Sequence, residues 1–270
     1  RVNADGKIAA LRAYWELAKG GYRRYARYRT AILAALIANG AFGFIRASLL
    51  MTAITTAGAA VGGYDLQQAS TYVWLGQGLL GAIPLWGVTE IAERVKSGEI
   101  AMDFLRPVAA LGQWWAADLG RAASQVIPRL VPMLAVGALT TGLALPGHPM
   151  PYLLFVVSLV LAVSLTFLAW TLVNLLAMWV GEIRGYHALF MIVMNLLTGL
   201  LVPVSWFPGW LRTLADATPF PSMFQTPIDV VMGLAGLEAI GVQAVWLVAL
   251  VGVAQLMLHR GTRKLVIHGG

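Results

Sequence analysis

One charged segment, from Glu90 to Pro107, holds the residues whose types and spacing are best suited to chemistry. It carries both acidic and basic side chains, so it is not a simple lipid-binding tract. Gly98 is suited to end one short helix and Pro107 to stop the next. The second piece has an apolar side, formed by Ile100, Phe104 and Leu105. A small amphipathic helix of this kind suits docking into the cleft of a cytoplasmic protein, and a solvated loop is the alternative.

The sequence lacks the residue patterns that catalysis requires. There is no cysteine, which excludes disulfides, zinc–thiolate sites and a thiol nucleophile. The four histidines lie near the ends of apolar segments or in tails, and no His/Glu cluster has the spacing of metal ligands. No Gly-x-x-x-x-Gly-Lys-Ser/Thr sequence occurs to cradle a nucleotide phosphate. We therefore expect no enzyme activity, no cofactor and no metal in this chain.

Arg46 is a charged residue inside an apolar segment, where charge is costly. It lies near the expected outer boundary of that segment, so it can reach the outer headgroups. It can instead pair with Asp65, Asp229 or a partner subunit, or face a substrate path.

Arg129 lies deeper, between Pro128 and Pro132. Prolines free backbone carbonyls and permit a bend, so Arg129 either binds those carbonyls or lines a polar vestibule for an anionic or amphipathic substrate. Asn174 and Asn195 are uncharged polar groups in apolar segments, for which hydrogen bonds between helices are the default interpretation. A tentative translocation path includes Arg46, Arg129, Asn174 and Asn195.

The elements that position these residues are transmembrane helices. Of the 270 residues, 59% are hydrophobic and 11% are charged, and the mean hydropathy is +0.74. A soluble domain is about 25% charged, so the composition indicates an all-α polytopic membrane protein. A helix needs about 20 apolar residues to cross the hydrocarbon core. Six segments qualify, namely 30–54, 70–91, 112–143, 152–180, 186–204 and 238–258.

The basic residues predict the orientation of these spans. Sixteen of the nineteen Lys and Arg residues fall in the two tails and in alternate connections on one side, with Arg94, Lys96, Arg106 and Arg121 assigned to the connection after the second span. The other side has only Arg212. By the positive-inside rule, both termini are cytoplasmic. The net charge of +7 therefore concerns the membrane and its lipids rather than nucleic acid.

Residues 1–29 form a segment with apolar and aromatic side chains at steps of three and four, surrounded by basic residues. This pattern predicts an amphipathic helix in the membrane interface, as an anchor held by anionic lipids. The alternative is a contact with a cytoplasmic partner or a gate helix beside a lateral opening. Residues 30–258 form the transmembrane domain, and residues 259–270 form a cytoplasmic tail.

Two groups of motifs carry a resemblance to a known family. The first is Glu93-Arg94-x-x-x-Gly98 followed by Leu105-Arg106-Pro107. The second comprises the segments 197–203, 206–210 and 218–221, rich in Gly, Pro and Trp. Together with six spans and inner termini, they resemble the permeases of ABC-2-type exporters, in a bacterial branch whose permeases often occur as two different subunits with one ATPase.

The resemblance implies a coupling segment over 92–110 and an outer re-entrant hairpin within 203–237. The ATPase would contact Glu93, Arg94, Lys96, Gly98, Glu99, Asp103, Phe104, Leu105, Arg106 and Pro107. The outer region would use Pro203, Trp206, Pro208, Trp210, Pro219 and Pro221.

The resemblance also implies partners and an activity. Two ATPase subunits, which carry ATP and Mg²⁺, would dock beneath two permease subunits in the bacterial plasma (inner) membrane. The pair would export a drug, an antibiotic or a lipid-like compound. The alternative is an ion-coupled secondary transporter without an ATPase, a class that usually shows buried acids and often inverted repeats. Neither feature is visible in the sequence.

Overall fold

A computed structural model describes residues 4–268, and these residues are mainly helical, with one isolated β-bridge between Val61 and Tyr64. The helices in chain order are α1 (Ala4–Ala26), α2 (Arg29–Ala57), α3 (Leu66–Leu79), α4 (Glu90–Ser97), α5 (Ile100–Phe104), α6 (Ala110–Thr140), α7 (Met150–Leu175), α8 (Ala177–Val180), α9 (Arg184–Leu197), the 3-10 helix η1 (Val204–Trp206), α10 (Gly209–Asp216), α11 (Phe220–Val231) and α12 (Leu237–His268). The predicted all-α fold is confirmed over the described part of the chain.

Four helical segments are long and apolar enough to cross a membrane, which makes the chain a multi-pass membrane protein. They are Thr30–Ala57, Ala110–Thr140, Met150–Val180 and Leu237–Lys264. Large apolar side chains on their outer faces are exposed, among them Ile37 on α2 and Val248 on α12. Such faces are typical of helices that are solvated by lipid.

The other two predicted spans are short helices. α3 and α9 have 14 residues each, about 21 Å at 1.5 Å per residue, which is less than a hydrocarbon core of about 30 Å. The continuous helix expected over 70–91 ends at Leu79. Pro84 accounts for this end, because its ring would clash with the carbonyl four residues earlier in a continuing helix. The count of six spans therefore stays a prediction.

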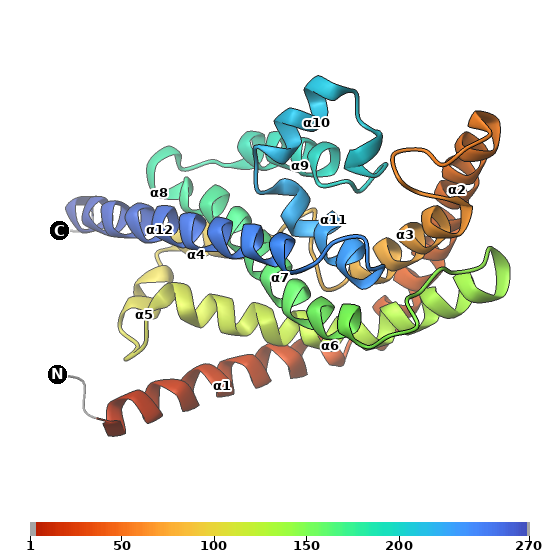
Figure 1. The fold of residues 1–270 in the computed structure, drawn as a ribbon. Coiled ribbons are helices and arrows are strands. Elements are labelled where there is room, and N and C mark those ends of the chain that lie inside the picture. The colour runs from red at the N-terminus through yellow and green to blue at the C-terminus, as the bar shows by residue number, and fades with distance from the viewer. Residues whose placement is uncertain (1–3, 269–270) are drawn as a thin grey trace.

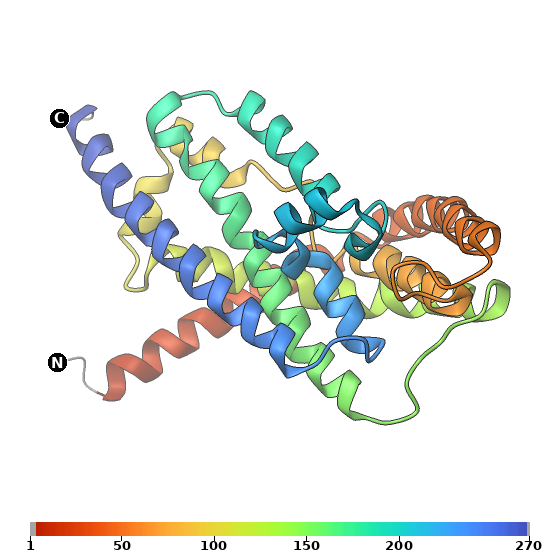
Figure 2. The same cartoon turned by 45° about the horizontal axis from the view of Figure 1, so that its top comes forward.

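The core forms around α7, which has the most buried apolar segment of the four long helices. α3, α11 and α12 pack against it or against each other, and Tyr72, Phe224 and Ile228 are fully buried there. Figures 1 and 2 show α4, α5 and α8 at the end of the molecule where α1 starts and α12 finishes. We call this the inner end, following the charge pattern. The α2–α3 and α6–α7 connections lie at the opposite end.

The predicted N-terminal amphipathic helix is present as α1, which lies along the first half of α6 (Figure 1). Glycines bring the two backbones together: a Cβ on Gly120 would lie 1.8 Å from the Ala18 carbonyl oxygen. Leu11 and Trp15, from the predicted apolar stripe, are 71% and 64% exposed. The position of α1 in the membrane interface stays a prediction, and residues 1–3 of the expected segment lie outside the described residues, as do 269 and 270 of the tail.

The predicted outer re-entrant region folds as η1, α10 and α11. Pro203, Pro208 and Pro219 directly precede these three elements, where a proline costs no helical hydrogen bond. Pro221 lies in the first turn of α11, whose inner face is buried in the core. Trp206 is partly buried against that core, whereas Trp210 is 72% exposed. Whether the region dips into the membrane stays a prediction.

Candidate functional site

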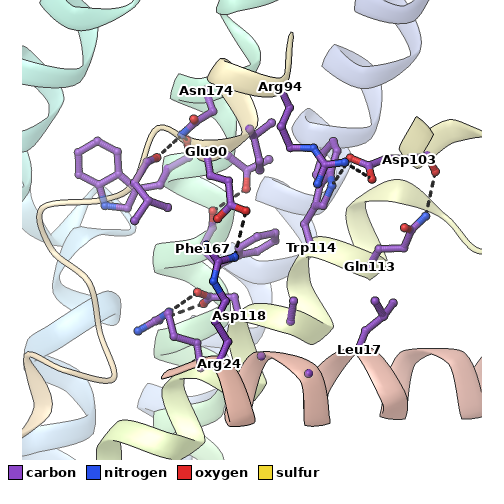
Figure 3. A pocket seen from close by; sticks show the side chains of 18 of the residues that line it. Leu17, Arg24, Glu90, Arg94, Asp103, Gln113, Trp114, Asp118, Phe167 and Asn174 are labelled. Carbon is purple, nitrogen blue, oxygen red and sulfur yellow. Dashed lines mark hydrogen bonds and ion pairs between the residues drawn. The ribbon is translucent and has the colours of Figure 1, made fainter. Parts of the chain in front are cut away.

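A charged cavity of about 370 Å³ lies at the inner end, between α1, α4, α5, α6 and α7 (Figure 3). We call it the inner cavity. Its charged lining residues are Glu16, Arg24, Glu90, Arg94, Asp103, Arg106, Asp118 and Arg121. Aromatic rings of Tyr25, Trp114, Phe167 and Trp170 complete the walls. Three residues of the predicted coupling segment, Arg94, Asp103 and Arg106, thus line a space inside the transmembrane domain.

Asp103 joins the coupling segment to the long helix that follows it. Its side chain is 1% exposed, and one carboxylate oxygen lies 2.7 Å from Arg94 Nη2 of α4. Its other oxygen accepts a hydrogen bond from Trp114 Nε1 of α6 at 3.0 Å. Gln113 Nε2 donates to the Asp103 carbonyl oxygen, also at 3.0 Å. Figure 3 shows these side chains meeting beside the cavity. The contacts hold α4, α5 and α6 as one unit.

Asn174 of α7 holds the beginning of α4. Its Nδ2 donates to the Val88 carbonyl oxygen at 2.8 Å, and its Oδ1 accepts from the Ala92 backbone N–H at 3.0 Å. The first turn of a helix has backbone N–H groups without helical partners, so this asparagine satisfies one of them. Asn174 lines the inner cavity, which agrees with its place on the predicted translocation path. Both polar atoms of its amide, however, are hydrogen-bonded to backbone groups.

Two ion pairs connect α4 to other inner elements. Lys96 Nζ lies 3.1 Å from Glu182 in the turn between α8 and α9. The hydrogen bond from Lys96, together with that from the Arg184 backbone N–H, lowers the pKa of Glu182 to about 2. On the other side, Arg24 of α1 lies 3.3 Å from Glu90, and this carboxylate raises the pKa of Arg24. These pairs are exposed, so each contributes little stability alone.

The free side of the coupling segment faces away from the protein. Ala92, Val95 and Ile100 are buried in a core cluster against α7, α8 and α12. By contrast, Met102, Phe104 and Leu105 are 62%, 40% and 77% exposed. The other predicted contact residues with exposed side chains are Glu93, Lys96, Glu99, Arg106 and Pro107. Gly98 ends α4 with a φ of +78°, as predicted, which favours glycine. The segment therefore presents an exposed apolar tip on a braced base.

The four residues of the tentative translocation path do not meet. Arg46 is near the outer end, where its Nη2 lies 3.5 Å from the Leu201 carbonyl oxygen. Its other two guanidinium nitrogens are buried without a partner. Neither predicted acid pairs with it: Asp65 caps α3, and Asp229 accepts hydrogen bonds from Tyr64 and Gln225. Asn195, on α9, has a buried Oδ1 without a partner.

Arg129 and Arg121 both lie on α6, beside the end of α3. The Arg129 side chain packs over Gly81, and its Nε is buried without a partner. Arg121 was assigned to a connection by the sequence pattern, and this was wrong: it is 8% exposed within the helix. It pairs with Asp118 and donates to the carbonyl oxygens of Gly81 and Ala82. The Asp118/Arg121 spacing of three residues was the available signal.

Within residues 4–268, no cluster of three His, Asp or Glu side chains is arranged to hold a metal. Comparison with known proteins gives one family: a model described as ABC-2 family transporter protein matches residues 43–269. The match covers most of the chain, including the whole coupling segment and the outer region, and begins within α2. No curated protein and no solved structure gives a significant match.

Proposed function

Because this chain belongs to the ABC-2 family of transporter proteins, we propose that it is the permease subunit of an ATP-driven exporter. Family membership makes it a membrane transport protein and implies association with an ABC ATPase. Our proposal adds that two ATPase copies bind the inner end, that they hold the ATP and Mg²⁺, and that this chain itself is not an enzyme. A second permease subunit, the same or a related chain, completes the transporter in a bacterial plasma membrane.

The observation that carries the proposal is the contrast between the two sides of the coupling segment. Its apolar tip at Met102, Phe104 and Leu105 is exposed, whereas its base is fixed by the Asp103 and Asn174 contacts. A small, amphipathic, rigidly mounted helix is the form that transmits a push from a docked protein to the spans behind it. Because α4 and α6 both line the inner cavity, movement of this unit would change the cavity.

The proposed cargo is an amphipathic or hydrophobic compound, such as a drug, an antibiotic or a lipid. The mixture of aromatic rings and paired charges around the inner cavity supports this class, because binding pockets combine apolar walls with a few placed polar groups. Outward movement agrees with the family resemblance. Family membership does not favour the ion-coupled alternative.

ATP turnover with and without the partner tests the proposal. The chain purified alone in liposomes should hydrolyse no ATP, and the complex purified with its native ATPase should do so. Loading the vesicles with a fluorescent amphipathic dye should then give ATP-dependent movement only in the complex. Robust hydrolysis by the chain alone, or dye movement driven by an ion gradient without ATP, would contradict the proposal.

A further inference from the structure

An open groove of about 960 Å³ runs between α1 and the first half of α6, separate from the inner cavity. Its walls include Leu11, Trp15 and Tyr22 of α1, with Trp115, Leu119 and Ala123 of α6. We call it the α1–α6 groove. Leu11 and Trp15 remain largely exposed beside it, so the two helices do not close over their apolar side chains. An apolar groove that is open in this way suits an apolar occupant.

The shape of the groove is fixed by two close contacts. Gly120 of α6 meets the Ala18 carbonyl so tightly that a side chain there has no room, and Gly21 of α1 meets Ala117 in the same way. Ala18 and Gly120 lie on the floor of the groove, whereas Gly21 and Ala117 line the inner cavity on the other side of the same helix contact. On the α6 side, Trp115 Nε1 donates to Ser164 of α7 at 2.9 Å, which holds the indole ring in the wall. The groove is therefore preformed, which lowers the entropic cost of binding.

Charge distinguishes this groove from an ordinary lipid-facing surface. Arg12 and Lys19 are the charged residues of its lining, and both are cations. They are seven residues apart on α1, about 10 Å along the helix, so both flank the apolar walls. Lys19 has an ion pair with Glu16, and Arg12 forms no ion pair with the residues that the structure describes. The rim thus offers positive charge beside a long apolar channel.

We propose that the α1–α6 groove binds one anionic phospholipid of the inner leaflet. An acyl chain would lie between the two helices, and the phosphate would bind Arg12 and Lys19. The occupant follows from charge complementarity, because the cytoplasmic leaflet is the anionic one and each Lys or Arg near it attracts such lipids. The aromatic rings of Trp15 and Trp115 are suited to the depth of the headgroups. The proposal goes beyond a helix anchored generally by anionic lipids. It assigns the phosphate to two particular cations, Arg12 and Lys19, and an acyl chain to a defined groove.

Native mass spectrometry of the full-length chain, titrated with phosphatidylglycerol or phosphatidylcholine, tests the site. The double variant Arg12→Gln/Lys19→Gln should retain about tenfold less phosphatidylglycerol than the parent, with phosphatidylcholine unchanged. The matched control is Arg23→Gln/Arg27→Gln, which removes the same charge from two exposed positions outside the groove, one in α1 and one directly after it. It should change retention less than about twofold. Equal losses in both variants would overturn the proposal, because they would indicate a diffuse basic helix.

A third variant tests the acyl channel independently of charge. Ala123→Trp adds a large side chain at an exposed position of the groove, and it should lower retention of both lipids. Unchanged retention would overturn the assigned channel. The groove would instead be a contact between copies if Leu11→Cys cross-linked to Ala123→Cys of another molecule. The chain has no other cysteine to interfere, and this result would also overturn the proposal.

Discussion

Asp103 is the residue on which the rigidity of the coupling segment depends most directly. It is buried, and its two oxygens serve different helices. In Asp103→Asn the negative charge that pairs with Arg94 is lost. The NH₂ group of the new amide would also face either Arg94 Nη2 or Trp114 Nε1, and both of these atoms are donors themselves. We expect a loss of about 1–3 kcal/mol in the free energy of unfolding, typical of a buried polar group left without its partner, measured by denaturant unfolding in detergent.

The control for this substitution is Glu99→Gln, four residues earlier in the same segment. Glu99 is exposed and makes no side-chain ion pair with the described residues, so its change should stay within about 0.5 kcal/mol. Similar losses in the two variants would show that Asp103 does not brace the segment.

Glu182 gives a prediction about pH. Its pKa is lowered to about 2 from a usual 4.5, so its pairing with Lys96 stabilises the folded protein above the usual pKa and is lost as the pH falls through about 2. Infrared difference spectra between the parent and Glu182→Gln should therefore show an ionised carboxylate from pH 8 down to about 3, where a glutamate of ordinary pKa is mostly protonated. A protonation midpoint at or above the usual 4.5 would mean that Lys96 does not hold this carboxylate.

At the scale of helices, the contact between α1 and α6 rests on glycine. Gly120→Ala places a Cβ 1.8 Å from the Ala18 carbonyl oxygen, and the helices must separate to accept it. We expect a loss of about 1–3 kcal/mol, as for overpacked sites, together with faster tryptic cleavage of α1. The control is Gly20→Ala, because a Cβ on Gly20 meets nothing within 4 Å. If Gly20→Ala and Gly120→Ala behave alike, α1 is not docked in this way.

The topology of the short helices gives a further prediction. If the protein crosses the membrane six times, Arg184→Cys, at the start of α9, is accessible only from inside. Trp210→Cys, in α10, is accessible only from outside. Labelling intact cells with a membrane-impermeant maleimide should therefore modify position 210 and spare position 184. Labelling of both positions, or of 184 alone, would contradict the six-span prediction.

The sequence predicted well those helices whose position depends on residues close together in the chain. Continuous apolar runs predicted α2, α6, α7 and α12, and Gly98 marked the end of α4. The helix over 70–91 was overextended because hydropathy does not register the steric effect of Pro84. The boundaries of α3 and α9 thus depend on breakers and packing more than on composition.

The hydrogen bonds that hold the candidate site together could not be predicted, because they join residues far apart in the chain. Asn174 contacts Val88 across 86 residues, and a polar residue in an apolar run predicts some hydrogen bond without naming its partner. The charge count assigned Arg121 to a connection, although the predicted span 112–143 contains it, because such a count assumes that arginine avoids the membrane interior. Its partner, Asp118, and two carbonyl oxygens remove most of that cost.

For the whole molecule, charged side chains concentrate at the inner end. The start of α1, the end of α12 and the coupling segment share that end (Figures 1 and 2), and the connection between α6 and α7, which contains His148, lies at the other. The exposed apolar tip of the coupling segment and the mixed charges beside it form the surface that a cytoplasmic ATPase would cover. The ATPase and the membrane-embedded helices of this chain would meet at that surface.

Site-specific cross-linking to the native ATPase tests this account most directly. Leu105→Cys, which is 77% exposed at the tip, should cross-link to the ATPase in membranes when a short bifunctional maleimide is added, and ATP should change the yield. His148→Cys, exposed at the opposite end, should give no such product. An ATPase that is never trapped at position 105, or is trapped equally at position 148, would contradict the claim that the coupling segment, 92–110, couples ATP hydrolysis to this permease.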